Sequence, residues 1–182
     1  MTGAPAGAST GASAGPRVVL VGPMGAGKTT VGGLLADGWG VGLRDTDQDI
    51  EHAEGRSVSD IFVDSGEQYF REREHAAVLA ALESHEGVLA LGGGAVLDER
   101  TRSALAGHFV VFLSVGLSDA VKRVGLGHGR PLLLGNVRSR VKVLLDERTP
   151  IYREVADVVV ETDGRTAREV ADEVRRAAEG RQ

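Results

Sequence analysis

Apolar and polar positions follow a regular pattern after residue 16. Short apolar runs of strand length are separated by longer stretches in which apolar residues recur with helical spacing. The runs that we expect to form strands are Arg17–Val21, Val41–Leu43, Gly87–Leu91, Phe109–Leu113 and Val158–Val160. Strands that alternate with helices favour a parallel sheet buried on both faces. The pattern therefore predicts an α/β fold with a five-stranded parallel sheet and helices on both faces.

Helical spacing fills most of the remaining chain. The longest such pattern covers Glu67–Leu82, where Phe70 and Val78 are expected to face the core. The other helices that we expect are Thr29–Ala36, Asp47–Ala53, Ser57–Val63, Asp98–Leu105, Ser118–Val124, Val137–Glu147 and Thr166–Ala178.

Two segments lack either pattern. Residues 1–16 contain only small residues after the methionine, so they bury too little apolar surface to become ordered, and we expect a flexible tail. Around residues 125–136, alternating glycines precede Arg130 and Pro131, and we expect a mobile lid, although a plain connector has the same composition. Residues 17–182 are expected to form one domain.

Composition narrows the class of protein. The net charge of −5 argues against a general nucleic-acid or membrane-surface binder, so an anionic ligand requires a local cluster of cations. The absence of cysteine excludes disulfides and thiolate chemistry and agrees with a cytoplasmic location. No apolar stretch is long enough to span a bilayer or to resemble a signal peptide.

The strongest chemical signal is Gly22–Thr29, which reads GPMGAGKT. This is the phosphate-binding P-loop pattern, in which glycines direct backbone N–H groups at phosphates. Lys28 supplies a positive charge to the outer phosphates, and the Thr29 hydroxyl is a ligand for Mg²⁺. An apolar run precedes the motif and a helical pattern follows it, as a nucleotide site requires.

A P-loop does not specify the reaction, and the remaining sequence argues for a kinase. No lysine lies in the Asn-Lys-x-Asp arrangement of guanine-reading GTPases, and the run Val88–Leu91 ends in Gly92–Gly94 without the acidic residue of a motor ATPase. Asp45 and Asp47 are the best source of carboxylates, one for the metal and one for an acceptor hydroxyl. Thr46 or Asp47 as a simple helix cap is the alternative.

Six elements together resemble the shikimate kinase family in order and approximate spacing. They are the P-loop, Asp45–Asp47, Ile61–Phe62 with Gly66–Glu74, Leu91–Gly94, Arg130–Leu133 and Arg148–Tyr152. The resemblance covers nearly everything after residue 16. It implies phosphorylation of the 3-hydroxyl of shikimate by MgATP on the pathway to chorismate and aromatic amino acids.

The resemblance also implies roles for individual residues. Asp47 would bind the reacting hydroxyl as a base or orienting group, Arg71 and Arg148 would bind the shikimate carboxylate, and the backbone of Gly92, Gly93 and Gly94 would bind the polyol. Guanidinium groups suit a carboxylate because their paired N–H groups match its two oxygens.

On the nucleotide side, Lys28 would hold the phosphates, Arg130 would stabilise phosphoryl charge, and Thr29 with Asp45 would serve Mg²⁺. Arg123 would stack on adenine, with the loop around Asp163–Thr166 close to the base. The full set of expected ATP-binding residues is Gly25, Ala26, Gly27, Lys28, Thr29, Thr30, Arg123, Arg130 and Arg165.

Alternatives remain open at this stage. Arg71 in the charged run Arg71–Glu74 also fits a solvated helix face, and Arg148 fits a helix-terminal cation before Pro150. The protein as a whole also fits another small-molecule kinase, for gluconate or a nucleoside monophosphate, or a nucleotide-binding regulator without turnover. The expected partners are shikimate and ATP, with neither nucleic acid nor membrane, and the expected oligomeric state is a monomer.

Overall fold

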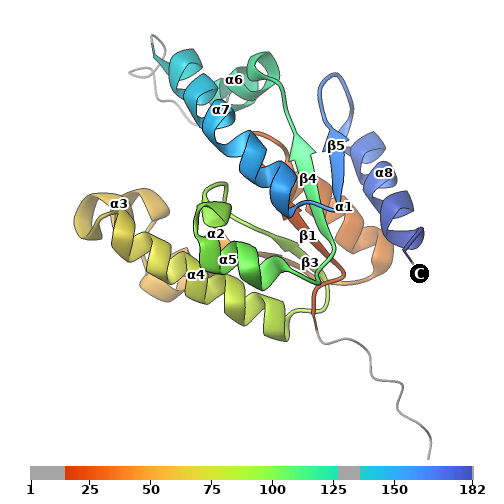
Figure 1. Ribbon diagram of the computed structural model, residues 1–182, viewed down its shortest axis with the longest axis horizontal. Helices are drawn as coiled ribbons and strands as arrows, with labels where there is room; N and C mark the ends of the chain where they lie inside the picture. The colour runs from red at the N-terminus through yellow and green to blue at the C-terminus, as the bar shows by residue number, and fades with distance from the viewer. Residues whose placement is uncertain (1–14, 127–135, 182) are drawn as a thin grey trace, which may run out of the picture.

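The computed structural model describes residues 15–126 and 136–181, and its centre is a five-stranded parallel sheet (Figure 1). The strand order is β2-β3-β1-β4-β5, and Val19 of β1 pairs with Leu89 of β3 and Val110 of β4. The strands are β1 (Val18–Val21), β2 (Leu43–Asp45), β3 (Val88–Ala90), β4 (Val110–Ser114) and β5 (Val158–Glu161). The predicted number and direction of strands are confirmed.

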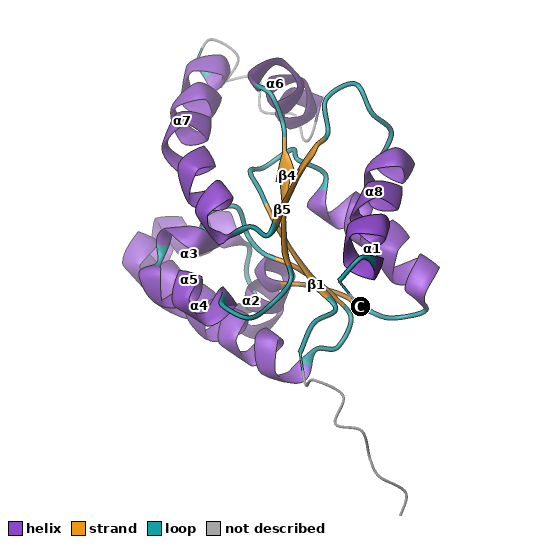
Figure 2. Ribbon diagram, turned by 45° about the vertical axis from the view of Figure 1, so that its right-hand side comes forward, coloured by secondary structure: helices purple, strands orange, loops and turns teal. Residues whose placement is uncertain are grey.

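Helices cover both faces of this sheet, which Figure 2 shows edge-on. On one face, α1 (Lys28–Trp39) and α8 (Ala167–Glu179) pack against Val18 and Leu20 of β1. On the other, α4 (Glu67–Ser84), α5 (Glu99–Leu105), the short η1 (Ala95–Leu97) and α7 (Val137–Val155) pack against Val19 and Val21. Successive side chains of a strand point to opposite faces of the sheet, so a single apolar strand contributes to the apolar core on each face.

Three further helices lie near one end of the sheet. α2 (Thr46–Glu54) and α3 (Val58–Ser65) both pack on α4, and a small apolar cluster of Ile50, Ile61 and Phe70 joins them. α6 (Leu117–Leu126) packs on α7 above the carboxyl end of β4 (Figure 1). These helices bound the loops that follow β1, β2 and β3.

Most element boundaries differ from the sequence prediction by one to three residues, and the differences at β2 and α7 have clear physical causes. β2 begins at Leu43 and not at Val41, because the Val41 N–H bonds to the Ala36 carbonyl and so belongs to the end of α1. α7 continues past Glu147 and through Pro150 to Val155. A proline inside a helix costs a hydrogen bond, but Tyr152 is completely buried and Ile151 packs beside it, which offsets that cost.

The predicted tail and lid fall largely outside the described residues, which exclude 1–14 and 127–135. Gly15 and Pro16, which we assigned to the tail, are described, and Pro16 is buried. The packed part of the chain therefore includes at least Pro16. Over the described ranges, no helix is both long and apolar enough to cross a membrane.

Candidate active site

A cavity of about 600 Å³ opens where the loops after β1, β2 and β3 meet. Parallel strands present their carboxyl ends at the same edge of a sheet, where α/β proteins bind ligands. The residues that we predicted and that line this cavity are Gly25, Gly27, Lys28, Thr29, Thr30, Asp45, Asp47, Arg71, Gly92, Gly93, Gly94 and Arg148. Side chains from distant parts of the sequence thus reach one space.

The P-loop forms the start of α1. Gly27 has a φ of 89°, a left-handed conformation that favours glycine, and no side chain caps the helix behind it. The first N–H groups of α1 and its positive end therefore remain available to an anion. The Lys28 ammonium donates to the carbonyls of Gly22, at 2.7 Å, and Pro23, at 3.0 Å. Burial lowers the pKa of Lys28 to about 8, although the charges of Asp47 and Asp45 oppose this effect.

Thr29 and Asp45 lie together beside this loop. The Thr29 hydroxyl donates to Asp45 Oδ2 at 3.3 Å. An oxygen atom at the start of α1 and one at the end of β2 therefore lie close enough to bind the same ion. Mg²⁺ prefers oxygen ligands and commonly takes only one or two from protein, with phosphates and water completing its shell. The pair fits a magnesium ion that arrives with a nucleotide.

Asp47 lies in the first turn of α2, and the cap of that helix is Asp45. Asp45 Oδ1 accepts the backbone N–H of Asp47 at 2.9 Å and that of Gln48 at 3.4 Å. The alternative reading of Asp47 or Thr46 as the cap is therefore wrong. Asp47 Oδ1 is buried without a hydrogen-bond partner among the described residues, and burial is the main cause of its raised pKa. It is suited to accept a hydrogen bond from a ligand.

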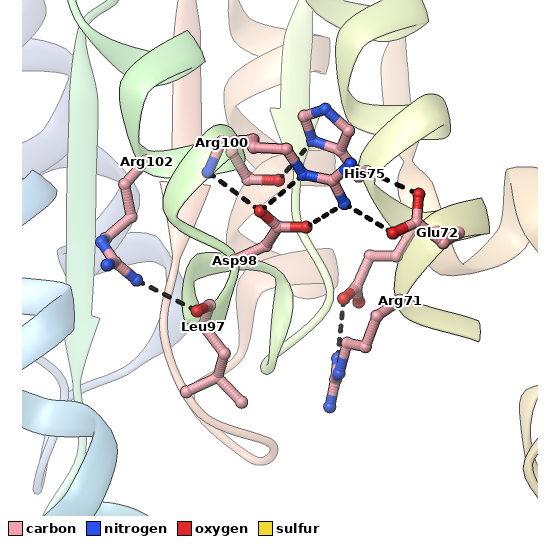
Figure 3. Close-up of polar contacts among 9 residues, drawn as sticks. Arg71, Glu72, His75, Leu97, Asp98, Arg100 and Arg102 are labelled. Carbon is pink, nitrogen blue, oxygen red and sulfur yellow. Dashed lines mark hydrogen bonds and ion pairs between the residues drawn. The ribbon is translucent and has the colours of Figure 1, made fainter. Parts of the chain in front are cut away.

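Arg71 projects from α4, as Figure 3 shows. It lines the cavity, and its side chain is only 18% exposed. Its Nη1 donates to Glu74 Oε1 at 2.6 Å, and its guanidinium lies near the rings of Phe62 and Phe70. The solvated-face alternative for Arg71 is therefore wrong. Burial raises the pKa of Glu74 to about 7, and the positive charge of Arg71 only partly opposes this.

The backbone of Gly92–Gly94 passes between these groups. A Cβ atom on Gly92 would collide with Asp47 Oδ1 and lie 2.9 Å from Glu74 Oε2, so only glycine allows the approach. A Cβ atom on Gly93 would lie 3.7 Å from Arg148 Nη1. Arg148 is inside α7, which continues to Val155, so the helix-terminal alternative for Arg148 is wrong.

Some predicted residues do not line the cavity. Ala26 is buried in the core below the P-loop. Arg123 Nη1 donates to the Gly25 carbonyl at 2.9 Å and to the Thr162 hydroxyl at 3.2 Å, which places it behind the loop. Arg165 is engaged with the Glu161 and Glu169 carbonyls and with Glu173. Arg130 lies outside the described residues. The roles of Arg123 and Arg165 at the purine and of Arg130 in the lid therefore stay predictions.

Two polar groups of the site, Glu74 and Tyr152, received no role in the sequence analysis. Glu74 is 2% exposed, and it lies four residues after Phe70 and four before Val78, both buried. That i, i+4 spacing is the signal that places Glu74 on the buried face of α4. The Tyr152 hydroxyl donates to the Gly93 carbonyl, a contact that sequence spacing does not reveal.

Comparison with known proteins shows the family to which this chain belongs. The family model described as shikimate kinase matches residues 24–179. The chain belongs to the shikimate kinase family. It is 62% identical to the shikimate kinase of Frankia casuarinae over 85% of this chain and 69% of that protein. It is 60% identical to that of Salinispora arenicola over 87% of this chain and 95% of the relative.

Solved structures of the shikimate kinase family share the fold. The shikimate kinase from Acinetobacter baumannii, in complex with shikimate, matches with a TM-score of 0.85 and 35% identity over 93% of this chain and 96% of that one. The shikimate kinase from Aquifex aeolicus matches with a TM-score of 0.75 and 30% identity over 90% of this chain and 96% of that one. The predicted family, P-loop kinase fold and kinase class are confirmed.

Proposed function

We propose that the cavity transfers the γ-phosphoryl group of ATP to the 3-hydroxyl group of shikimate, giving 3-phosphoshikimate in the pathway to chorismate. The single observation that carries this proposal is that Asp47, Arg71 and Arg148 line the same cavity as the P-loop lysine. Membership of the shikimate kinase family supports it, as does the similarity to a shikimate-bound relative.

Arg71 and Arg148 hold the shikimate carboxylate, which orients the ring against the Gly92–Gly94 backbone. Two guanidinium groups approach the cavity from α4 and α7, so they can bind a carboxylate from two sides. The ring of shikimate then carries its hydroxyl groups toward Asp47. Asp47 Oδ1, which has no partner among the described residues, accepts the hydrogen bond of the reacting hydroxyl and takes its proton as the oxygen attacks phosphorus.

Lys28 and the N–H groups at the start of α1 hold the transferring phosphates. At neutral pH Lys28 is still protonated, because its pKa of about 8 lies above 7, and it therefore supplies positive charge. Thr29 and Asp45 would hold Mg²⁺, which neutralises phosphate charge when it is bound with ATP. Arg130 adds charge from the lid, and Arg123 and Arg165 flank the purine.

We further infer that the protein acts as a monomer in the cytoplasm. The net charge of −5 gives no general affinity for nucleic acid or anionic membranes, and the anionic ligands are met by the cavity's own cations.

A coupled assay of ADP release tests the proposal. The purified chain is given MgATP with shikimate, gluconate or a set of nucleoside monophosphates, and the shikimate reaction is repeated with the metal chelated. We expect turnover with shikimate and with neither of the other acceptors. We also expect that chelation of the metal abolishes the turnover of shikimate. Turnover with gluconate or a nucleoside monophosphate instead would favour another small-molecule kinase, and nucleotide binding without turnover would favour a regulator.

A further inference from the structure

The Gly92–Gly94 segment is held by two side-chain hydroxyls from distant parts of the chain. The Gly92 N–H donates to Thr46 Oγ1 at 3.2 Å, and the Gly93 carbonyl accepts the Tyr152 hydroxyl. Thr46 begins α2, directly before Asp47, whereas Tyr152 lies in α7, one helical turn after Arg148. Each hydroxyl thus joins the glycine backbone to an element that carries a proposed substrate-binding side chain.

The Tyr152 contact fixes the orientation of a peptide group. The Gly93 carbonyl and the Gly94 N–H belong to one planar trans peptide, so they point in opposite directions. Consecutive glycines restrict backbone rotation very little, and this peptide plane would otherwise turn easily. A donor on the Gly93 carbonyl therefore sets the direction of the Gly94 N–H. Gly94 itself lies against Arg71, because a Cβ atom at this position would collide with the Arg71 guanidinium.

Tyr152 is itself held rigidly. Its side chain is completely buried, and its ring stacks on Phe112 of β4 with centroids 5.0 Å apart. Burial raises the pKa of its hydroxyl, and the nearby positive charge of Arg148 opposes that rise without removing the proton at neutral pH. The hydroxyl therefore remains a donor to the Gly93 carbonyl.

We propose that Tyr152, assisted by Thr46, is a positioning residue for shikimate: it orients the Gly93–Gly94 peptide and couples that peptide to the helix that carries Arg148. This role rests on the proposed function. It predicts that loss of the hydroxyl weakens the binding of shikimate and leaves the binding of ATP unchanged, because within the described residues no hydrogen bond joins Tyr152 to the P-loop.

Tyr152→Phe tests the role because it removes the hydroxyl and keeps the ring on Phe112. The loss of one hydrogen bond corresponds to a rise of about 3- to 10-fold in the shikimate KM. We expect the ATP KM to stay within about twofold, since a general loss of structure would change both constants. Tyr69→Phe is the matched control: it removes the hydroxyl of the other tyrosine, which donates to Glu54 at 2.9 Å and does not line the cavity.

Thr46 provides a second variant if Tyr152→Phe is too unstable to assay. Thr46→Val removes the acceptor of the Gly92 N–H, and Thr46→Ser keeps it, so the shikimate KM should rise in the first and return toward wild type in the second. Folded Tyr152→Phe and Thr46→Val proteins with unchanged shikimate KM would overturn the proposal. Failure of the wild-type chain to phosphorylate shikimate would instead overturn the proposed function.

Discussion

Two clusters of charged side chains have similar chemistry and different surroundings: one lies within α4, and the other joins α4 to the start of α5. In the inner cluster, Arg71 pairs with Glu74 at 2.6 Å, and their side chains are 18% and 3% exposed. In the outer cluster, which Figure 3 shows, Arg100 pairs with Asp98 at 2.7 Å and with Glu72 at 2.8 Å, and the Arg100 side chain is 53% exposed. The short distances alone do not distinguish the two clusters.

The protonation behaviour does distinguish them. Hydrogen bonds from Arg100 lower the pKa of Asp98 to about 2, whereas burial raises the pKa of Glu74 to about 7 despite its arginine. Water stabilises the exposed charges of Arg100 and Glu72, so their pairing adds little free energy. In the inner cluster the loss of water dominates, which keeps the Arg71 guanidinium less neutralised by its partner and available to an anionic ligand.

The largest expected effect comes from Asp47→Asn, beside the inner cluster. The amide cannot take the hydroxyl proton, so kcat should fall by about 10²-fold or more, while nucleotide binding persists. The melting temperature should stay near that of wild type, because the cap of α2 is Asp45. Asp98→Asn changes the capping carboxylate of α5 and is the matched outer variant; asparagine caps well, so its kcat should be normal.

Steady-state kinetics with shikimate and MgATP, beside a thermal melt of each protein, measure this difference. An Asp47→Asn protein that melts normally and turns over within a few-fold of wild type would exclude Asp47 as the proton acceptor.

Arg71→Ala should have the next largest effect. Loss of a charge-assisted pair with the substrate carboxylate corresponds to a rise of about 30- to 150-fold in the shikimate KM, with the ATP KM unchanged. Glu74 can be protonated near neutral pH, so removal of its partner Arg71 does not leave an unpaired buried charge and should not unfold the protein. Saturation curves for shikimate and for ATP measure the two constants separately. An unchanged shikimate KM would show that Arg71 does not bind the substrate carboxylate.

A smaller effect is expected from pH through Glu74, which faces Arg71, Asp47 and Arg148. Below its pKa of about 7 Glu74 is neutral, and Arg71 is free to bind the shikimate carboxylate. Above that value the ionised Glu74 competes for Arg71 and repels the substrate. The shikimate KM should therefore rise by about 5-fold as pH increases from 6 to 8.

Glu74→Gln sharpens this test because it removes the ionisation and keeps a hydrogen-bonding side chain of the same size. Its shikimate KM should vary little over the same pH interval. The ATP KM, measured in parallel, reports on Lys28, whose pKa is about 8. Equal pH profiles for wild type and Glu74→Gln would contradict the role of Glu74.

The smallest effect is expected in the outer cluster. Arg100→Ala should leave both KM values and kcat within about twofold, because exposed ion pairs contribute little and Arg100 does not line the cavity. Any loss of stability should be present at neutral pH and absent near pH 2, since ionised Asp98 stabilises the fold above its unfolded pKa of 3.8 and loses that effect as pH falls through about 2. Thermal melts at the two pH values measure this, and a large kinetic defect would show that the outer cluster supports the site.

Features that depend on neighbouring residues could be predicted from the sequence, whereas features that depend on packing between distant segments could not. The P-loop and the sheet follow from spacing and from apolar runs, because the phosphate contacts and strand burial depend on neighbouring residues. Arg71 was correctly assigned to the cavity only through the family resemblance; its charged neighbours alone suggested a surface.

The missed features depend on contacts between distant segments. The path of α7 through Pro150 depends on burial of Tyr152 against β4, and local propensity gives the opposite answer. The alternative interpretation, in which Thr46 or Asp47 caps α2, was one or two residues late, since Asp45, Thr46 and Asp47 all suit that position and only the observed backbone distinguishes them.

The two oxygens of Asp45 have separate partners, and this limits how the active site can be altered. Oδ1 accepts the N–H of Asp47, and Oδ2 accepts the Thr29 hydroxyl. A substitution made at residue 45 to change the preferred metal would also release the first turn of α2, and with it Asp47. Redesign of the metal preference and redesign of the acceptor preference are consequently not independent: a library that varies residue 45 has to vary residue 47 with it.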